Sequence, residues 1–218
     1  MGATSRRDCD KSKSYSSEMI KTLFFDIGGV LLTNGWDHDA RERAAKIFSL
    51  DQNEIEKRHE PLFRSFECGS LTTKEYLDKV IFYEKRDFSH QTFFEFMKSQ
   101  SKPLYNNLDM AAQLSKDERY RLYAINNESL DLNTYRVETF GLYKYFPAMF
   151  SSCFLGVCKP DVRIFQIVLN VLHQNPSECL LIDDREENIE GAKKAGLDTV
   201  HLPDASKLME KLMEKGEL

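Results

Sequence analysis

One carboxylate stands at the end of an apolar run and is followed almost at once by two glycines. The run is TLFF over residues 22–25, and the chain continues with Asp26, Ile27, Gly28 and Gly29. β-Branched and aromatic residues without a charged interruption predict a strand that is buried on both faces. Asp26 then lies at the carboxyl end of a strand, where open α/β sheets bind their ligands.

Three other segments place polar residues after short apolar runs. Asn126 and Asn127 follow LYAI, Asp183 and Asp184 follow LLI, and Lys159 lies in GVCKPD. Because the carboxyl ends of parallel strands meet at one edge of a sheet, we expect these side chains to share one crevice with Asp26. Carboxylates gathered in one place repel each other, so the crevice needs neutralising partners.

A magnesium ion would neutralise such a cluster, because Mg²⁺ binds oxygen ligands and keeps several waters beside one or two carboxylates. We expect Asp26 and Asp184 to be direct ligands, with the main-chain carbonyl of Gly28 as a third. Asp183 would act through a water or orient the site. Lys159 would offset the negative charge that remains.

The elements that must position these residues alternate between short strands and helices after residue 107, which predicts a parallel sheet with crossover helices. Further strands are expected at residues 121–125, 148–152, 179–182 and 198–202. Helices are expected at residues 109–115, 131–140, 162–172 and 186–196, the last with Gly196 as its C-cap. The fold class is therefore α/β, with a Rossmann-like, doubly wound parallel sheet.

The segment between the first two strands has the spacing of amphipathic helices. Four such patterns, at residues 40–50, 53–66, 72–83 and 91–100, predict an inserted α-helical bundle that acts as a cap. Asp51 and the Thr72–Glu75 pair are N-terminal capping signals. We therefore assign residues 19–36 and 104–218 to the core, 37–103 to the cap, and the polar residues 1–18 to a disordered tail or expression remnant.

Composition bounds the class of protein. The chain has 218 residues, 41% of them hydrophobic, which suffices for one large domain with an insertion. Its net charge of -5 argues against a nucleic-acid partner. No apolar run approaches the roughly 20 residues of a membrane helix, so we expect a cytoplasmic protein with no membrane partner. The oligomeric state stays open.

The cysteines follow neither a zinc pattern nor a disulfide framework. Reduced, mostly structural thiols are the expectation for a cytosolic chain. The residues concerned are Cys9, Cys68, Cys153, Cys158 and Cys179.

Four segments, in this order, resemble the motifs of the haloacid dehalogenase superfamily. They are FFDIGGVLL at residues 24–32, YAINNES at 123–129, CKPD at 158–161 and LIDDREENIEGAKKAG at 181–196. Each is short, but the four together in their strand contexts form a specific signal. The chain is most similar to phosphatase-like members with a helical cap inserted after the first motif, and the resemblance covers residues 21 to about 203.

The resemblance implies a mechanism. Asp26 would be the nucleophile that forms an aspartyl-phosphate, which water then hydrolyses. Magnesium and Lys159 would supply positive charge, while Asn126, Asn127 and the main-chain amides up to Gly29 would position the phosphate. The cap would close over the substrate and exclude water.

Two residues depart from the family pattern. Gly28 stands where most of these phosphatases have a second Asp as general acid, a role typically worth about 10²–10⁴ in rate. Three explanations stay open: a substrate with a good leaving group, another acid such as Asp37 or His38, or a protein that binds phosphorylated ligands without turnover. Asn126 replaces the usual Ser or Thr, which could alter the phosphate pocket.

The favoured function is a magnesium-dependent hydrolase that removes phosphate from a small phosphorylated metabolite, such as a phosphosugar, through an aspartyl-phosphate. Its activity could be reduced by the loss of the second Asp. The alternative is a non-catalytic phospholigand-binding or regulatory protein of the same family. A haloacid dehalogenase is less favoured, because those enzymes use no divalent metal and the Asp183–Asp184 pair suits one.

Overall fold

A computed structural model describes residues 19–218, so the predicted tail at residues 1–18 lies outside the described part. One sheet of five parallel strands has the order β3-β2-β1-β4-β5. This confirms the predicted fold class and places the first strand at its centre. The strands are β1 (Thr22–Phe25), β2 (Arg121–Asn126), β3 (Met149–Ser151), β4 (Cys179–Asp183) and β5 (Asp198–His201).

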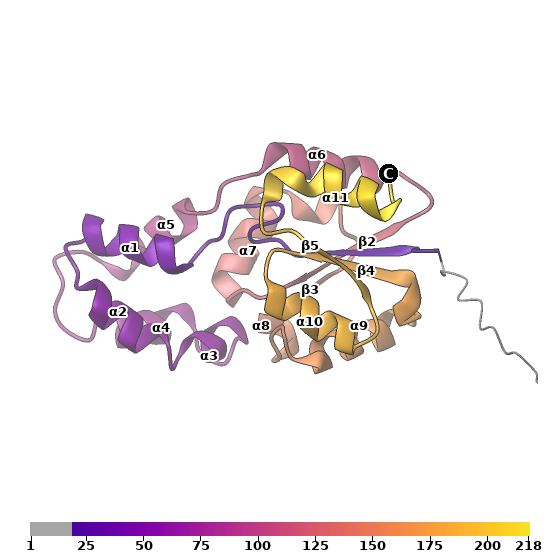
Figure 1. The fold of residues 1–218 in the computed structure, drawn as a ribbon. Coiled ribbons are helices and arrows are strands. Elements are labelled where there is room, and N and C mark those ends of the chain that lie inside the picture. The colour runs from indigo at the N-terminus through magenta and orange to yellow at the C-terminus, as the bar shows by residue number, and fades with distance from the viewer. Residues whose placement is uncertain (1–18) are drawn as a thin grey trace, which may run out of the picture.

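Helices cover both faces of the sheet (Figure 1). On one face lie α6 (Tyr105–Leu114) and α11 (Leu208–Lys215), and on the other lie α9 (Val162–Leu172) and α10 (Glu186–Lys194). The C-cap of α10 is Ala195 rather than the predicted Gly196, which follows it with a φ of 92°. The remaining core elements are α7 (Leu130–Thr139), η1 (Leu142–Lys144), α8 (Ser152–Leu155), η2 (Pro176–Glu178) and η3 (Ala205–Lys207). Within residues 19–218, no helix is long and apolar enough to cross a membrane.

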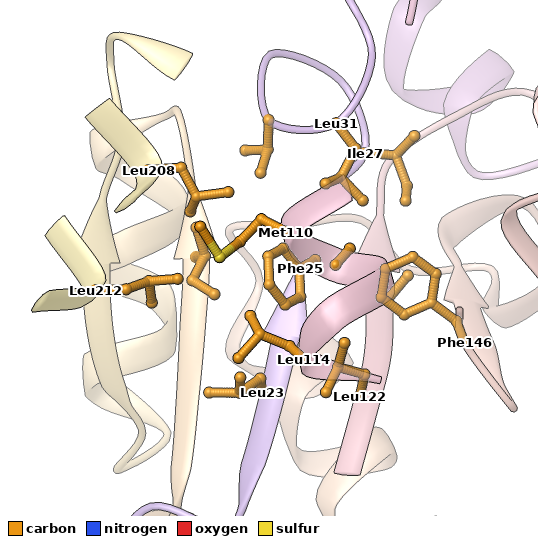
Figure 2. Close-up of a cluster of buried hydrophobic side chains, with 14 of the residues drawn as sticks. Leu23, Phe25, Ile27, Leu31, Met110, Leu114, Leu122, Phe146, Leu208 and Leu212 are labelled. Carbon is orange, nitrogen blue, oxygen red and sulfur yellow. The ribbon is translucent and has the colours of Figure 1, made fainter. Parts of the chain in front are cut away.

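Strand β1 is fully buried because its side chains alternate between two apolar layers. Leu23 and Phe25 point into the cluster that Figure 2 shows, with Leu114 of α6 and Leu212 of α11. Phe24 belongs to the cluster on the opposite face. Burial of a large apolar side chain contributes about 1.5–3 kcal/mol to the free energy of folding. The buried strand therefore holds the main chain of Asp26, the next residue, in a fixed position.

The cap helices lie to one side of the sheet in Figure 1. They are α1 (His38–Ile47), α2 (Gln52–His59), α3 (Phe63–Glu67), α4 (Thr73–Val80) and α5 (His90–Ser99). Asp51 caps α2, and Thr72 with Glu75 forms the expected capping box of α4. The prediction of one helix over residues 53–66 is wrong, because the chain breaks between α2 and α3. Pro61 has no amide hydrogen and cannot continue the helical hydrogen bonds.

Two linkers join the cap to the core and are bonded to each other. The Thr33 N–H donates to the Lys102 carbonyl at 2.9 Å, and the Thr33 hydroxyl donates to the Gln100 carbonyl at 2.7 Å. Arg136 of α7 donates to the Thr33 carbonyl at 2.7 Å. These hydrogen bonds between the linkers lie close to the predicted cap limits at residues 37 and 103. The limits themselves stay a prediction.

One prediction about cysteines is wrong in this structure. Cys68, just after α3 in the cap, is disulfide-bonded to Cys158 in the core, and their Cα atoms are 6.0 Å apart. The pair is 90 residues apart in sequence, so only the docking of the cap brings the two side chains together. Cys153 and Cys179 are free thiols. Cys9 lies outside the described residues.

Candidate active site

Three carboxylates meet at the carboxyl ends of the two central strands. Strand register pairs Phe25 of β1 with Ile182 of β4, so the residues that follow them, Asp26 and Asp183, lie side by side. Asp184 comes next in the chain. One carboxylate oxygen of each of the three lies within 4.8 Å of the others, which is close enough to share one metal ion.

Lys159 brings a positive charge into this cluster. Its Nζ lies 3.1 Å from Oδ1 of Asp26 and 2.6 Å from Oδ2 of Asp183, and its side chain is fully buried. Asn127 holds the lysine in place, because its amide donates to the Lys159 carbonyl and accepts from the Lys159 N–H. Burial alone would lower the pKa of Lys159, but Asp183 and Asp26 raise it above its ordinary value.

The two carboxylates after β4 differ in their partners. Asp183 bonds Lys159 through Oδ2, while Oδ1 accepts from the Asn188 amide and the Arg185 N–H, both at 2.9 Å. Oδ1 of Asp184, in contrast, is buried and has no hydrogen-bond partner within residues 19–218. Burying a carboxylate oxygen without a hydrogen-bond donor costs free energy. Oδ1 of Asp184 is therefore a candidate metal ligand.

Glycine is required at position 29 for two reasons. Its φ of 70° is in the left-handed region that side chains rarely adopt. A Cβ there would also collide with the carboxylate of Asp184. The absence of a side chain at Gly29 thus lets the turn after β1 approach the Asp184 carboxylate.

Of the two carboxylates next to Lys159, Asp26 is more open to a ligand than Asp183. Its Oδ1 accepts from the Ile27 N–H at 2.7 Å and faces Lys159. Within the described chain, no hydrogen bond or ion pair reaches its Oδ2. Burial raises the pKa of Asp26, Lys159 opposes this shift, and Asp183 and Asp184 add to it, so that the pKa is about 7.

The charges and donors fit a divalent cation. Three carboxylates lie beside one ammonium group, so ionising all of them leaves two negative charges that Lys159 does not balance. Burial and Asp183 also raise the pKa of Asp184, which is the sign of a carboxylate short of positive partners. An oxygen-only set with an unpartnered buried oxygen is the chemistry that Mg²⁺ selects.

The predicted phosphate-binding amides have partners of their own. Asn126 is buried, donates from Nδ2 to Oδ1 of Asn133 at 3.1 Å and accepts from the Ser151 hydroxyl at 2.8 Å. Asn127 lines the pocket above Asp26, although both ends of its side-chain amide bond Lys159. Asn127 thus shares a pocket with Asp26, and phosphate binding by the side chains of Asn126 and Asn127 stays a prediction.

The space beside Gly28 is filled by a different residue. A Cβ at Gly28 would lie 2.7 Å from Oδ1 of Asn34, so the Asn34 side chain stands where a second Asp side chain would begin. Of the two alternative acids, Asp37 lines the pocket but caps α1 by accepting from the Ala40 N–H at 2.8 Å. His38 is mostly exposed beside Glu56 and does not line the pocket with Asp26.

The pocket over Asp26 lies between core and cap. Its lining combines amide, charged and aromatic side chains. No local pattern in the sequence singles out two charged residues among them, Glu67 of α3 and Arg136 of α7. Both lie on helices, where a charged side chain is normally exposed to water, and only the folded chain brings them to the pocket that Asp26 lines. The pocket is also lined by Gly28, Asn34, Asp37, His59, Asn127, Glu128, Arg185 and Asn188.

The fold and this carboxylate site define a class of hydrolase. The sequence model of the haloacid dehalogenase-like hydrolases matches residues 20–196, and the chain belongs to this family. That assignment confirms the resemblance of the four motifs.

Relatives with assigned activities are distant but span most of the chain. Flavin mononucleotide hydrolase 1 from Arabidopsis thaliana is 26% identical over 198 residues, covering 90% of this chain and 78% of its own. D-ribitol-5-phosphate phosphatase from Bacteroides thetaiotaomicron is 26% identical, covering 83% of this chain and 91% of its own. A haloacid dehalogenase family enzyme from the same bacterium, solved as a magnesium complex, superposes with a TM-score of 0.76 at 26% identity, over 89% of this chain and 98% of its own.

Proposed function

We propose that this protein is a magnesium-dependent phosphomonoesterase that acts on a small phosphorylated metabolite. The observation that carries the proposal is the cluster of Asp26, Asp184 and Lys159, with one buried oxygen of Asp184 unpartnered and Oδ2 of Asp26 unbonded within residues 19–218. A magnesium complex of a structural neighbour and the phosphatase activity of a relative support it.

Asp26 is the nucleophile in this proposal. Its Oδ1 is held by the Ile27 N–H and by Lys159, which fixes the carboxylate and leaves Oδ2 to attack phosphorus. Lys159 spreads positive charge over Asp26 and the bound phosphoryl group. Asp183 acts as a positioning residue, because it holds Lys159 at 2.6 Å and is itself held by Asn188.

Asp26, Asp184 and the Gly28 carbonyl would hold Mg²⁺, and Asp183 would act indirectly by positioning Lys159. When bound, the ion supplies positive charge that neutralises the carboxylates and the phosphoryl oxygens. The protein's own residues do the rest: they position the phosphate in line with Asp26 and shield it under the cap.

The pocket lining favours a polar leaving group. Asn34, Asp37, His59 and Arg185 offer donors and acceptors, and Phe63 offers an aromatic face. Hydroxyl groups of a sugar or polyol phosphate suit such a lining, and one relative is a ribitol-5-phosphate phosphatase. A phosphosugar or phosphopolyol is therefore the proposed substrate class. A cytoplasmic location stays a prediction from composition.

The test is release of inorganic phosphate from a panel of sugar phosphates, polyol phosphates, acyl phosphates and nucleotides, with and without Mg²⁺. Asp26→Asn should abolish release, and Asp109→Asn, an exposed Asp on α6, should leave it unchanged. Release that needs no metal, or that survives in Asp26→Asn, would refute the mechanism. No release by the folded, magnesium-loaded wild type would favour the non-catalytic binding protein.

A further inference from the structure

We propose that Glu67 of the cap is the general acid and base of the phosphatase reaction, in place of the second Asp that Gly28 replaces. This inference rests on the proposed function and names the residue that completes it. Three observations support the inference. Glu67 lines the pocket over Asp26, and its main chain is hydrogen-bonded to the core. The other candidate groups already have hydrogen-bond partners.

The position of Glu67 is set by contacts between cap and core. Its carbonyl, at the end of α3, accepts a 2.6 Å hydrogen bond from the Ser152 hydroxyl, which in turn accepts from the Glu128 N–H at 3.0 Å. Two residues on, Gly69 lies so close to the Cys153 main chain that a Cβ would meet it. The end of α3 is therefore seated on the core, and the Glu67 side chain lines the same pocket as Asp26.

The other pocket carboxyl groups are already in use. Asp37 caps helix α1. Glu128 bonds Arg136 at 2.8 Å through one oxygen and the Ser129 N–H at 2.9 Å through the other. Within residues 19–218, no hydrogen bond or ion pair reaches the carboxyl group of Glu67. Among the carboxyl groups that line this pocket, Glu67 is thus the one that no hydrogen bond or ion pair within residues 19–218 engages, which leaves it to exchange a proton with substrate.

The remaining groups near the pocket cannot easily act as acids. Asn34, which stands beside Gly28, carries an amide that does not give up a proton near neutral pH. His59 is bonded through Nδ1 to the Tyr76 hydroxyl at 2.7 Å. Burial lowers the pKa of His59 to about 4, so it is neutral at pH 7 and has no acidic proton of the required strength.

The charges around Glu67 suit proton transfer near neutral pH. Burial, together with the nearby Glu128, raises the pKa of Glu67 to about 7. Arg185 and Arg64, followed by Lys159, oppose the shift without pairing with the carboxyl. An acid with a pKa close to the working pH transfers protons most effectively, because both protonation states are populated.

The reaction balances with these groups. As the oxygen of Asp26 bonds phosphorus, the bond from phosphorus to the leaving oxygen breaks, and the Glu67 carboxyl gives its proton to that oxygen. A water then attacks the phosphorus of the aspartyl-phosphate and gives a proton to the Glu67 carboxylate. The bond between Asp26 and phosphorus breaks, and inorganic phosphate leaves with both side chains restored.

The experiment compares Glu67→Gln with Glu60→Gln, a control at an exposed glutamate of the same cap. The substrates are 4-nitrophenyl phosphate, whose leaving group needs no proton, and alkyl phosphates such as glycerol phosphate, whose leaving group does. We expect Glu67→Gln to lower kcat/KM for the alkyl phosphates by about 10²–10⁴-fold and for 4-nitrophenyl phosphate far less. Glu60→Gln should match the wild type on both.

A pH profile and a second variant guard against trivial explanations. In the wild type, kcat/KM for the alkyl phosphates should fall above about pH 7, and this limb should vanish in Glu67→Gln. Glu67→Asp, which keeps a carboxyl, should recover part of the alkyl phosphate activity. Thermal unfolding of each variant establishes that it is folded.

Each outcome has a separate meaning. Equal losses on both substrate types in folded Glu67→Gln would overturn the proton-transfer role, as would no loss on either, and the phosphatase function would stand in both cases. If the wild type releases no phosphate even from 4-nitrophenyl phosphate, the proposed function fails and the role of Glu67 falls with it.

Discussion

Replacing Lys159 with methionine removes the ammonium group that separates two buried carboxylates. Methionine has a similar length and can occupy the buried space of the lysine side chain, so the change is mainly one of charge. The ammonium lies 3.1 Å from Asp26 and 2.6 Å from Asp183, and none of its side chain is exposed. We expect the variant to lose stability and to gain affinity for a divalent cation.

The magnitude follows from these distances. At an effective dielectric constant of about 20, unit charges at such separations attract by about 5 and 6 kcal/mol. Desolvation of the lysine offsets much of that attraction, and removal of one partner from a buried pair typically costs about 3–5 kcal/mol. The expected loss in the free energy of unfolding for Lys159→Met is therefore about 3–5 kcal/mol, measured without metal.

The assay is urea denaturation at pH 7.5 in the presence of a chelator, followed by a magnesium titration. Lys21→Met is the matched control, because Lys21 pairs with Glu178 at the surface and such a pair contributes about 0–1 kcal/mol. Magnesium should stabilise Lys159→Met more than the wild type, since the uncompensated carboxylates bind the ion more tightly. A loss no larger than that of Lys21→Met would refute the argument that Lys159 neutralises the site.

Three further predictions concern the same pocket. Asp184→Asn should abolish the rise in melting temperature that Mg²⁺ produces, whereas Glu187→Gln, a change at an exposed residue nearby, should keep it; equal shifts would contradict the assignment of Asp184 as a ligand. Gly28→Asp should lower thermal stability because its Cβ meets Asn34 at 2.7 Å, and Gly28→Asp combined with Asn34→Ala should recover it, so additive losses in a double-mutant cycle would count against the contact. The pKa of Glu67 is raised to about 7 from an ordinary 4.5, so the stability that its protonation contributes is fully present below pH 4.5 and is lost as the pH rises through 7. Denaturation across this range should therefore show that the free energy of unfolding of Glu67→Gln exceeds that of the wild type by an amount that grows with pH. A difference that stays constant with pH would refute the shift.

Much of the core followed from local pattern. The apolar run before Asp26 and the alternation of strands and helices after residue 107 predicted five parallel strands. A strand buried on both faces is typical of a parallel sheet that helices cover on both sides. The capping signals at Asp51 and Thr72 also held, since a cap depends on a few adjacent residues. The helix predicted over residues 53–66 is instead two helices, because Pro61 cannot continue the helical hydrogen bonds.

The candidate site was predictable in part for the same reason. Asp26, Asp183 and Asp184 come together because strand order and register carry strand ends to one edge of the sheet. The partners of Asn126 and Asn127 were not predictable, because a buried amide bonds whatever lies beside it after folding.

The sequence by itself determined that this chain forms an α/β core with an inserted cap and that acidic and basic groups gather at its strand ends. Those features depend on hydrophobic periodicity and on short motifs, which are local. Only the tertiary structure decided that Asn34 fills the space beside Gly28, that Cys68 meets Cys158 and that Glu67 lines the same pocket as Asp26. The last two pairs join residues distant in sequence across the boundary between cap and core, and no local pattern encodes how two packed surfaces align.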